Sequence, residues 1–137
     1  MTETKRPINP PTLARPIGFA HGWLVEHGGG GRTLYLAGQC GHDAAGVIVA
    51  PGDLVGQLDR ALANVGEVLH AADMSFADLV QLNLYVTSRN DYVAARTAIG
   101  TVWRRHCARH YPAMAMFMVA ALFDPAAVIE IQGIAAR

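Results

Sequence analysis

The stretch from Leu79 to Ser88, LVQLNLYVTS, constrains the fold more than any other part of the sequence because its side chains alternate between two faces from Val80 to Thr87. Successive side chains of a β-strand point to opposite faces, so this alternation predicts a strand with one buried face. The chain must therefore contain a sheet with another layer packed on one side of it. The buried face is expected to hold Val80, Leu82, Leu84 and Val86, and the other face Gln81, Asn83, Tyr85 and Thr87.

Two helical patterns supply that layer. Between residues 54 and 69 apolar side chains recur at spacings of three and four, and Asp53 precedes them as a candidate N-cap. A second stripe covers residues 92–103, with Ser88 or Asn90 as its cap. We expect both helices to cover one face of the sheet, which makes the fold class α+β.

Five further segments belong to the expected organisation. Residues 23–26 and 33–37 predict a hairpin, because a loop of four glycines joins them. Residues 47–49 form a possible short strand, and residues 127–135 form the closing strand. Residues 1–16 are polar and rich in proline, which predicts a loose N-terminal arm. No interior linker divides the chain, so residues 1–137 are expected to form a single domain.

A row of methionines raises the question of what covers the sheet's second face. Met114, Met116 and Met118 fall on one face of the strand in HYPAMAMFMVAAL, and the other face is also apolar. A strand that is apolar on both faces is expected to be buried on both, but the two helices cover only one. We therefore expect other copies of the chain to cover the second face in a closed ring.

Composition excludes several classes of partner. Hydrophobic residues make up 52% of the chain and charged residues 16%, with a formal net charge of zero. This balance argues against a dedicated nucleic-acid surface, which gathers basic residues on one face. The start lacks an apolar signal segment, and no stretch is long enough to span a bilayer. We expect a cytoplasmic protein with no membrane association.

The sequence predicts no metal site. Cys40 and Cys107 stand far apart without a CxxC motif, so two reduced thiols are expected. His106 and His110 have helical spacing, but no HExxH pattern accompanies them. They belong to a basic cluster at the expected end of the second helix, where positive charge complements the helix dipole.

Five motifs in order resemble the RidA family, also called YjgF or L-PSP-like: RPIGFAHG, LAGQCG, QLDRALANVGEVLHAA, LNLYVTSRNDYVAAR and YPAM…IEIQGIA. The resemblance covers the chain from about Arg15 to Ala135. It implies a chorismate-mutase-like fold with a mixed sheet and two helices on one face. It also implies a homotrimer with a small-molecule cleft between subunits. The best-known members hydrolyse reactive enamines and imines released by pyridoxal-phosphate enzymes, and they need no cofactor.

Three positions match the family's site residues. Glu130 matches an acidic residue that orients or activates the attacking water, which makes it the candidate catalytic residue. Burial between two isoleucines would suit this carboxyl group to proton transfer. The alternative is a glutamate that faces solvent or a neighbouring subunit's arginine. Gly38 and Gln39 match the family's Gly-Gln, whose backbone amide helps to bind the ligand's acid group.

Two positions depart from the family. Met114 stands where the family has an arginine that grips the substrate's carboxylate. A thioether carries no charge, and losing a charge-assisted hydrogen bond costs about 1.5–3 kcal/mol. Phe19, with His21, replaces a tyrosine of the N-terminal motif. Met114 and Met116 would make the cleft apolar and adaptable, which favours a neutral or aromatic guest. Alternatively, the methionines only fill the core between subunits.

Cys40 and His42 are further candidates for ligand contact. They follow the Gly-Gln pair and would face the same side of an extended segment, where the histidine could activate a thiolate or act as a base. The alternative is a buried thiol beside a surface histidine.

Two functions of different class fit these residues. The first is a cofactor-free imine or enamine hydrolase, with Glu130 positioning water. The second is a non-catalytic trimer that binds a small metabolite or a partner protein through the altered cleft. Ribonuclease activity, attached to some relatives, ranks third because no histidine pair in a basic groove is evident.

Overall fold

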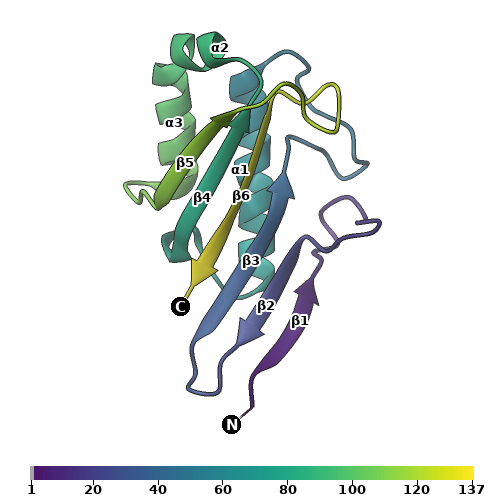
Figure 1. Cartoon of the computed structure of the whole chain (residues 1–137), viewed down its shortest axis with the longest axis vertical. Helices are drawn as coiled ribbons and strands as arrows, with labels where there is room; N and C mark the ends of the chain where they lie inside the picture. The colour runs from purple at the N-terminus through teal and green to yellow at the C-terminus, as the bar shows by residue number, and fades with distance from the viewer. Residues whose placement is uncertain (1) are drawn as a thin grey trace.

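The computed structural model describes residues 2–137 as one sheet with helices on one side (Figure 1). The strands are β1 (Thr4–Ile8), β2 (Gly22–Glu26), β3 (Arg32–Gln39), β4 (Leu79–Val86), β5 (Ala113–Met118) and β6 (Ile129–Ala136). The helices are α1 (Leu54–Ala71), α2 (Arg89–Ala94) and α3 (Arg96–Cys107), with a short 3₁₀ helix, η1 (Phe76–Asp78).

The sheet is mixed. Its strand order is β1-β2-β3-β6-β4-β5, and β4–β5 is the parallel pair in an otherwise antiparallel arrangement. Figure 1 shows α1 behind the sheet and α3 beside it. This confirms the expected α+β fold with two main helices on one face of a mixed sheet. No helix of residues 2–137 is long and apolar enough to cross a membrane.

Both main helices pack by the stripes predicted from their spacing. Asp53 accepts a hydrogen bond from the Gly56 amide and so caps α1, as expected. Ser88, rather than Asn90, caps α2 by accepting from the amide of Asp91. The predicted second helix is broken at Ala95 into α2 and α3.

Two expectations about short segments were wrong. The N-terminal arm is not loose throughout, because residues 4–8 form β1 and pair with β2. Pro7 is tolerated there because β1 is an edge strand. Residues 47–49 form no strand; Ile48 makes only an isolated bridge to His42.

Two irregularities in register change which side chains face the helices. Between β4 and β6 the register shifts at Leu79–Gln81, and this bulge leaves Val80 exposed instead of buried as predicted. A second shift lies in β3 between Leu36 and Gln39, where it pairs with β6.

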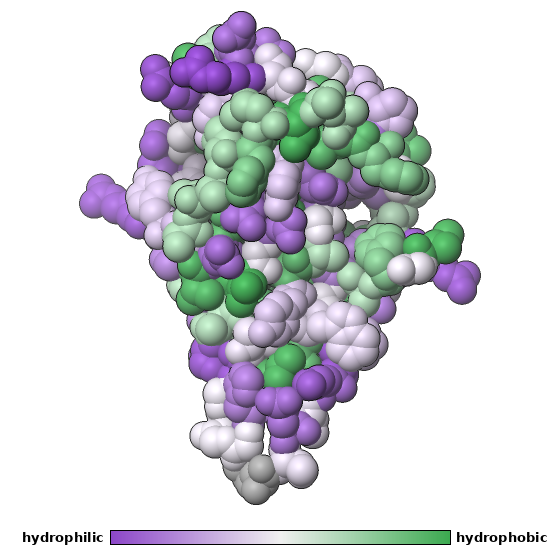
Figure 2. All heavy atoms as spheres, in the orientation of Figure 1, coloured by the Kyte–Doolittle hydropathy of each residue, from purple (hydrophilic) through white to green (hydrophobic). Residues whose placement is uncertain are grey.

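The face of the sheet away from the helices carries aromatic side chains. Trp23 and Tyr35 pair across β2 and β3 and are both exposed. Tyr85 stacks on Phe117 across β4 and β5, with ring centroids 5.3 Å apart. Figure 2 shows apolar residues gathered below the hydrophilic upper tip of this view and around a hollow at the right, whereas the end that carries the N-terminus is mostly hydrophilic. The same face of the sheet also carries polar side chains, from Gln81, Asn83 and Gln132.

Candidate functional site

A cavity of about 810 Å³ lies where β3 and β6 meet the loops that precede β2, follow β3 and precede β6. It brings together six of the predicted site residues: Phe19, Gly38, Gln39, Cys40, His42 and Glu130. Further charged or polar lining comes from Arg15, His21, Asp43, Asn64 and Asp124.

The bulge in β3 lets the Glu130 carboxyl group lie directly against the backbone. The extra residue falls between Leu36 and Gln39, opposite the β6 segment that follows Glu130. A Cβ atom at Gly38 would come within 2.8 Å of Cδ and Oε1 of Glu130. Glycine at position 38 therefore makes room for the carboxyl group at the cavity wall.

Cys40 holds that carboxyl group from one side. Its Sγ lies 3.6 Å from Oε1 of Glu130, and the thiol donates. Burial, followed by the nearby Glu130 carboxylate, raises the pKa of the Cys40 thiol to about 12. The thiol therefore stays protonated near neutral pH, which makes it a hydrogen-bond donor to Glu130 and disfavours the thiolate considered above.

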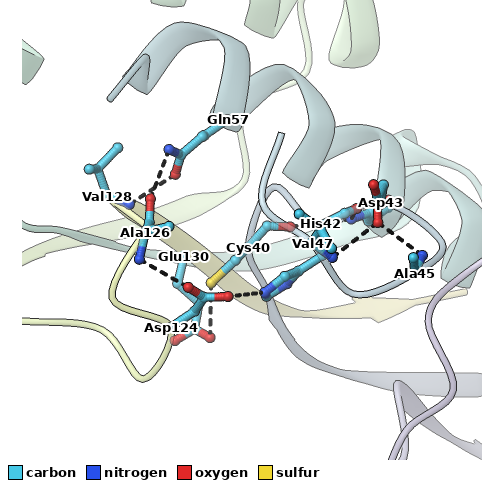
Figure 3. Close-up of polar contacts among 11 residues, drawn as sticks. Cys40, His42, Asp43, Ala45, Val47, Gln57, Asp124, Ala126, Val128 and Glu130 are labelled. Atoms are coloured by element: carbon cyan, nitrogen blue, oxygen red, sulfur yellow. Dashed lines mark hydrogen bonds and ion pairs between the residues drawn. The ribbon is translucent and has the colours of Figure 1, made fainter. Parts of the chain in front are cut away.

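His42 contacts the carboxylate of Asp124 and not that of Glu130. Its Nε2 lies 3.1 Å from Oδ2 of Asp124, and Oδ1 of Asp124 accepts from the Ala126 amide. These contacts, the Ala126 amide first, lower the pKa of the Asp124 carboxyl group. Figure 3 shows the Cys40 thiol and the His42 ring directed toward Glu130 and Asp124 respectively. The two side chains thus act on separate carboxylates.

His21 fixes the loop that carries Phe19. The His21 ring is buried, with Nε2 2.7 Å from the Ala14 carbonyl oxygen and Nδ1 3.0 Å from Nε2 of Gln39. Because a carbonyl only accepts, Nε2 carries the proton and Nδ1 accepts from the Gln39 amide. Gln39 therefore acts through its side chain as a support for this wall, and Phe19 packs edge-on against His21.

Gln57 ties the loop before β6 to α1. The side chain is fully buried and donates to the carbonyl oxygens of Ala50 (3.3 Å) and Ala126 (3.1 Å). Its Oε1 accepts from the Val128 amide at 2.9 Å (Figure 3). This arrangement sets the position of Asp124 and of the start of β6.

Met114 and Met116 lie elsewhere, in a groove of about 400 Å³ between α3 and β5. Their strand neighbours Leu82 and Leu84 are buried under the helices, so the methionine row is on the helix side of the sheet. Glu130 pairs with Tyr85 and points to the opposite face. Within one chain, Met114 and Glu130 therefore belong to separate sites.

The methionines are not core residues of the single chain. Met114, Met116 and Met118 are 46%, 37% and 48% exposed although they lie on the helix side. β5 is an edge strand, and all six of its residues are exposed. Residues 2–137 thus leave both faces of this strand partly exposed, although the strand was expected to be buried on both.

Comparison with known proteins identifies the family. The family described as Endoribonuclease L-PSP matches residues 21–137. The chain belongs to the RidA (YjgF, L-PSP) family. A 2-iminobutanoate/2-iminopropanoate deaminase from goat (Capra hircus) is 34% identical to this RidA-family chain over 106 residues, which is 77% of this chain and 74% of the relative.

Two further proteins match nearly the whole chain. RutC family protein UK114 from Drosophila melanogaster is 32% identical over 134 residues, 98% of this chain and 91% of that protein. The chain in the crystal structure of E. coli TdcF with bound serine is 26% identical in sequence, with a TM-score of 0.79. The match covers 96% of this chain and 98% of the TdcF chain.

Several residues of this RidA-family site were missed by sequence reasoning. Asp124, Asn64 and Arg15 line the larger cavity, and Asn64 donates to the backbone carbonyl oxygens of Cys40 and His42. No local sequence pattern predicts these residues, because their partners in the site are distant in sequence. His42 and Asp124, for example, are 82 residues apart. The Asp-Pro dipeptide at Asp124 predicts a turn, but it does not predict that Asp124 contacts His42.

The histidines with helical spacing in this RidA-family chain do not converge on a common point. His106 donates to Asp59 Oδ1 at 2.6 Å, and His110 donates to the Leu79 carbonyl oxygen at 2.7 Å. Among the side chains of residues 2–137, no three metal-binding groups gather in one place. The two histidines instead tie the end of α3 to α1 and to β4.

Proposed function

We propose that the protein is a cofactor-free imine or enamine deaminase in which Glu130 activates water. The observation that carries the proposal is the Glu130 carboxyl group, held by Cys40 and fitted against Gly38 at the wall of a cavity large enough for a small substrate. The names of the relatives, including the goat deaminase of 2-iminobutanoate and 2-iminopropanoate, support the same class of reaction.

The reaction adds water to a carbon–nitrogen double bond. The substrate reacts as an imine that is protonated on nitrogen. Glu130 accepts a proton from water while the water oxygen bonds to the imine carbon, and the nitrogen takes the electron pair of the double bond, which gives a carbinolamine. Glu130 then returns its proton to that nitrogen. The carbon–nitrogen bond breaks, the hydroxyl proton is released as the carbonyl forms, and ammonia leaves. An imine and water thus become a carbonyl compound and ammonia.

We propose further that the protein is a homotrimer with its clefts between subunits. Two observations support association: the exposed aromatic and methionine side chains of β5 and its neighbours, and the separation of Met114 from Glu130 on opposite faces of one chain. A cleft that contains both residues requires the larger cavity of one copy to face the groove of the next.

The test is hydrolysis of an imine formed in situ from an amino acid by an amino-acid oxidase, with semicarbazide as a trap. An active protein lowers the fraction of imine that is trapped. We expect Glu130→Gln, which keeps the shape of the side chain, to lower kcat at least about a hundredfold, since general acid–base catalysis contributes that much. Glu67→Gln, on the exposed side of α1, is the matched control and should retain full activity.

A non-catalytic binding protein is the second candidate, and Met114 favours it. Without a guanidinium at this position a bound imino acid loses an anchor that the resemblance implies. In that case the native protein would show no turnover, yet a small ligand would raise its Tm. A native protein with turnover that survives Glu130→Gln would contradict the proposed role of Glu130.

A further inference from the structure

Positive charge on the groove between α3 and β5 is not balanced by any acid in its lining. Arg96, at the start of α3, lines this groove together with Met114 and Met116, and it is the one lining residue with a formal charge at neutral pH. Arg96 is exposed, and no side chain of residues 2–137 forms an ion pair with it. Its guanidinium is therefore available to an anion.

The larger cavity has the opposite charge. Arg15 is its one arginine, against the carboxyl groups of Asp43, Asp124 and Glu130. Three carboxylates outweigh one guanidinium, so a ligand anion is repelled there and a cation is attracted. The larger cavity and the groove between α3 and β5 thus prefer groups of opposite charge.

A 2-imino acid carries both charges on neighbouring carbons: a protonated imine and a carboxylate. We propose that Arg96 binds the substrate carboxylate and so replaces the arginine that is absent at position 114. This inference rests on the proposed function, because Arg96 reaches a substrate held by Glu130 only where two copies face each other. The iminium group then lies in the acidic cavity of one copy, and the carboxylate lies in the groove of its neighbour.

The remaining lining of the groove selects the substrate's side chain. Trp103 and Tyr111 stack with ring centroids 6.2 Å apart, and Met114 and Met116 add flexible thioethers. Burial raises the pKa of Tyr92, so its hydroxyl group keeps a proton that it can donate to an anion. The preferred substrate is accordingly an imino acid with a bulky apolar or aromatic side chain, and not the neutral guest expected from Met114 alone.

The test measures binding, with two probes of the same shape and different charge. Phenylacetate carries a carboxylate and phenylacetamide does not. By titration calorimetry we expect the native protein to bind phenylacetate at least about tenfold more tightly than phenylacetamide, as for a charge-assisted hydrogen bond. Arg96→Gln should abolish this preference. Arg89→Gln, an exposed arginine on α2 outside the groove, is the matched control and should preserve it.

A rescue variant separates anion binding from a structural role of Arg96. The double variant Arg96→Gln/Met114→Arg moves the guanidinium across the groove and should regain the preference for phenylacetate. A purely structural role would not respond to a charge placed at position 114. Failure of the rescue, in a variant whose Tm equals that of the single variant, would overturn the proposal.

Two other results would overturn it: a native protein that binds acid and amide equally, or a preference that is lost in Arg15→Gln and kept in Arg96→Gln. The second result would assign the anion to the larger cavity. Binding of the probes does not require turnover. A protein that discriminates through Arg96 but hydrolyses no imine would therefore refute the deaminase and leave the carboxylate site standing.

Discussion

Glu130 lies so close to Gly38 that a Cβ atom at position 38 would be 2.8 Å from the carboxyl oxygen Oε1 of Glu130. Carboxyl group and glycine come from adjacent strands, and the bulge in β3 brings them together. The position of the proposed catalytic group therefore depends on the absence of a side chain one strand away.

Gly38→Ala should displace the Glu130 carboxyl group and lower kcat/KM on the order of a hundredfold, the effect of misplacing a catalytic group by about 1 Å. The free energy of unfolding should change by less than about 1 kcal/mol, because position 38 is exposed and its φ suits alanine. Gly29→Ala is the control: its Cβ would contact nothing within 4 Å. Equal activity of both variants would show that the carboxyl position does not matter.

The Cys40 thiol should be almost unreactive in the native protein. Burial and the Glu130 carboxylate raise its pKa to about 12 from an ordinary value of 9.0, so the thiolate fraction at pH 8 is about a thousandfold lower than in the unfolded chain. Iodoacetamide labelling followed by mass spectrometry should be slow in buffer and fast in urea. Glu130→Gln should accelerate labelling of Cys40 but not of Cys107, whose pKa is raised by burial alone.

The same shift gives a pH dependence of stability. A thiol with a folded-state pKa above its unfolded value contributes stability that is fully present below about pH 9 and is lost as the pH rises toward 12. Urea unfolding at pH 8 and pH 10.5 should show a smaller loss in Cys40→Ala than in the native protein. An equal loss in both would contradict the assignment.

Gln57→Ala should destabilise the protein by about 2–4 kcal/mol, because it leaves the Val128 amide and the carbonyl oxygens of Ala50 and Ala126 without this partner. The measurement is urea unfolding followed by circular dichroism. Arg60→Ala, on the same helix and partly exposed, is the control, and its expected change is less than about 1 kcal/mol. Similar values for both variants would show that Gln57 does not hold the loop.

The oligomer should depend on Phe117, which stacks on Tyr85 on the face away from the helices. Phe117→Glu would place a charge in the proposed subunit interface and should shift the protein from trimer to monomer in sedimentation velocity at micromolar concentration. Val93→Glu replaces another exposed apolar residue, on α2, and should leave the trimer intact. A native protein that sediments as a monomer would refute the intersubunit cleft.

Local patterns of the sequence determined most of the secondary structure. The alternation in residues 79–86, the helical spacing after Asp53 and the glycine loop each specify an element because strand and helix periods act over a few residues. The ordered motifs also indicated the family, and with it the mixed sheet and its helices. The same patterns missed β1 because polar side chains dominate an edge strand.

Only the tertiary structure decided how the site is assembled. Cys40 meets Glu130 across 90 residues and His42 meets Asp124 across 82, and no periodicity encodes such pairs. Strand register, including two bulges, determines the face on which each side chain lies. Met114 and Glu130 therefore lie on opposite faces of the sheet. Register follows from the packing of the whole sheet, which is why the sequence could name these residues but not their arrangement.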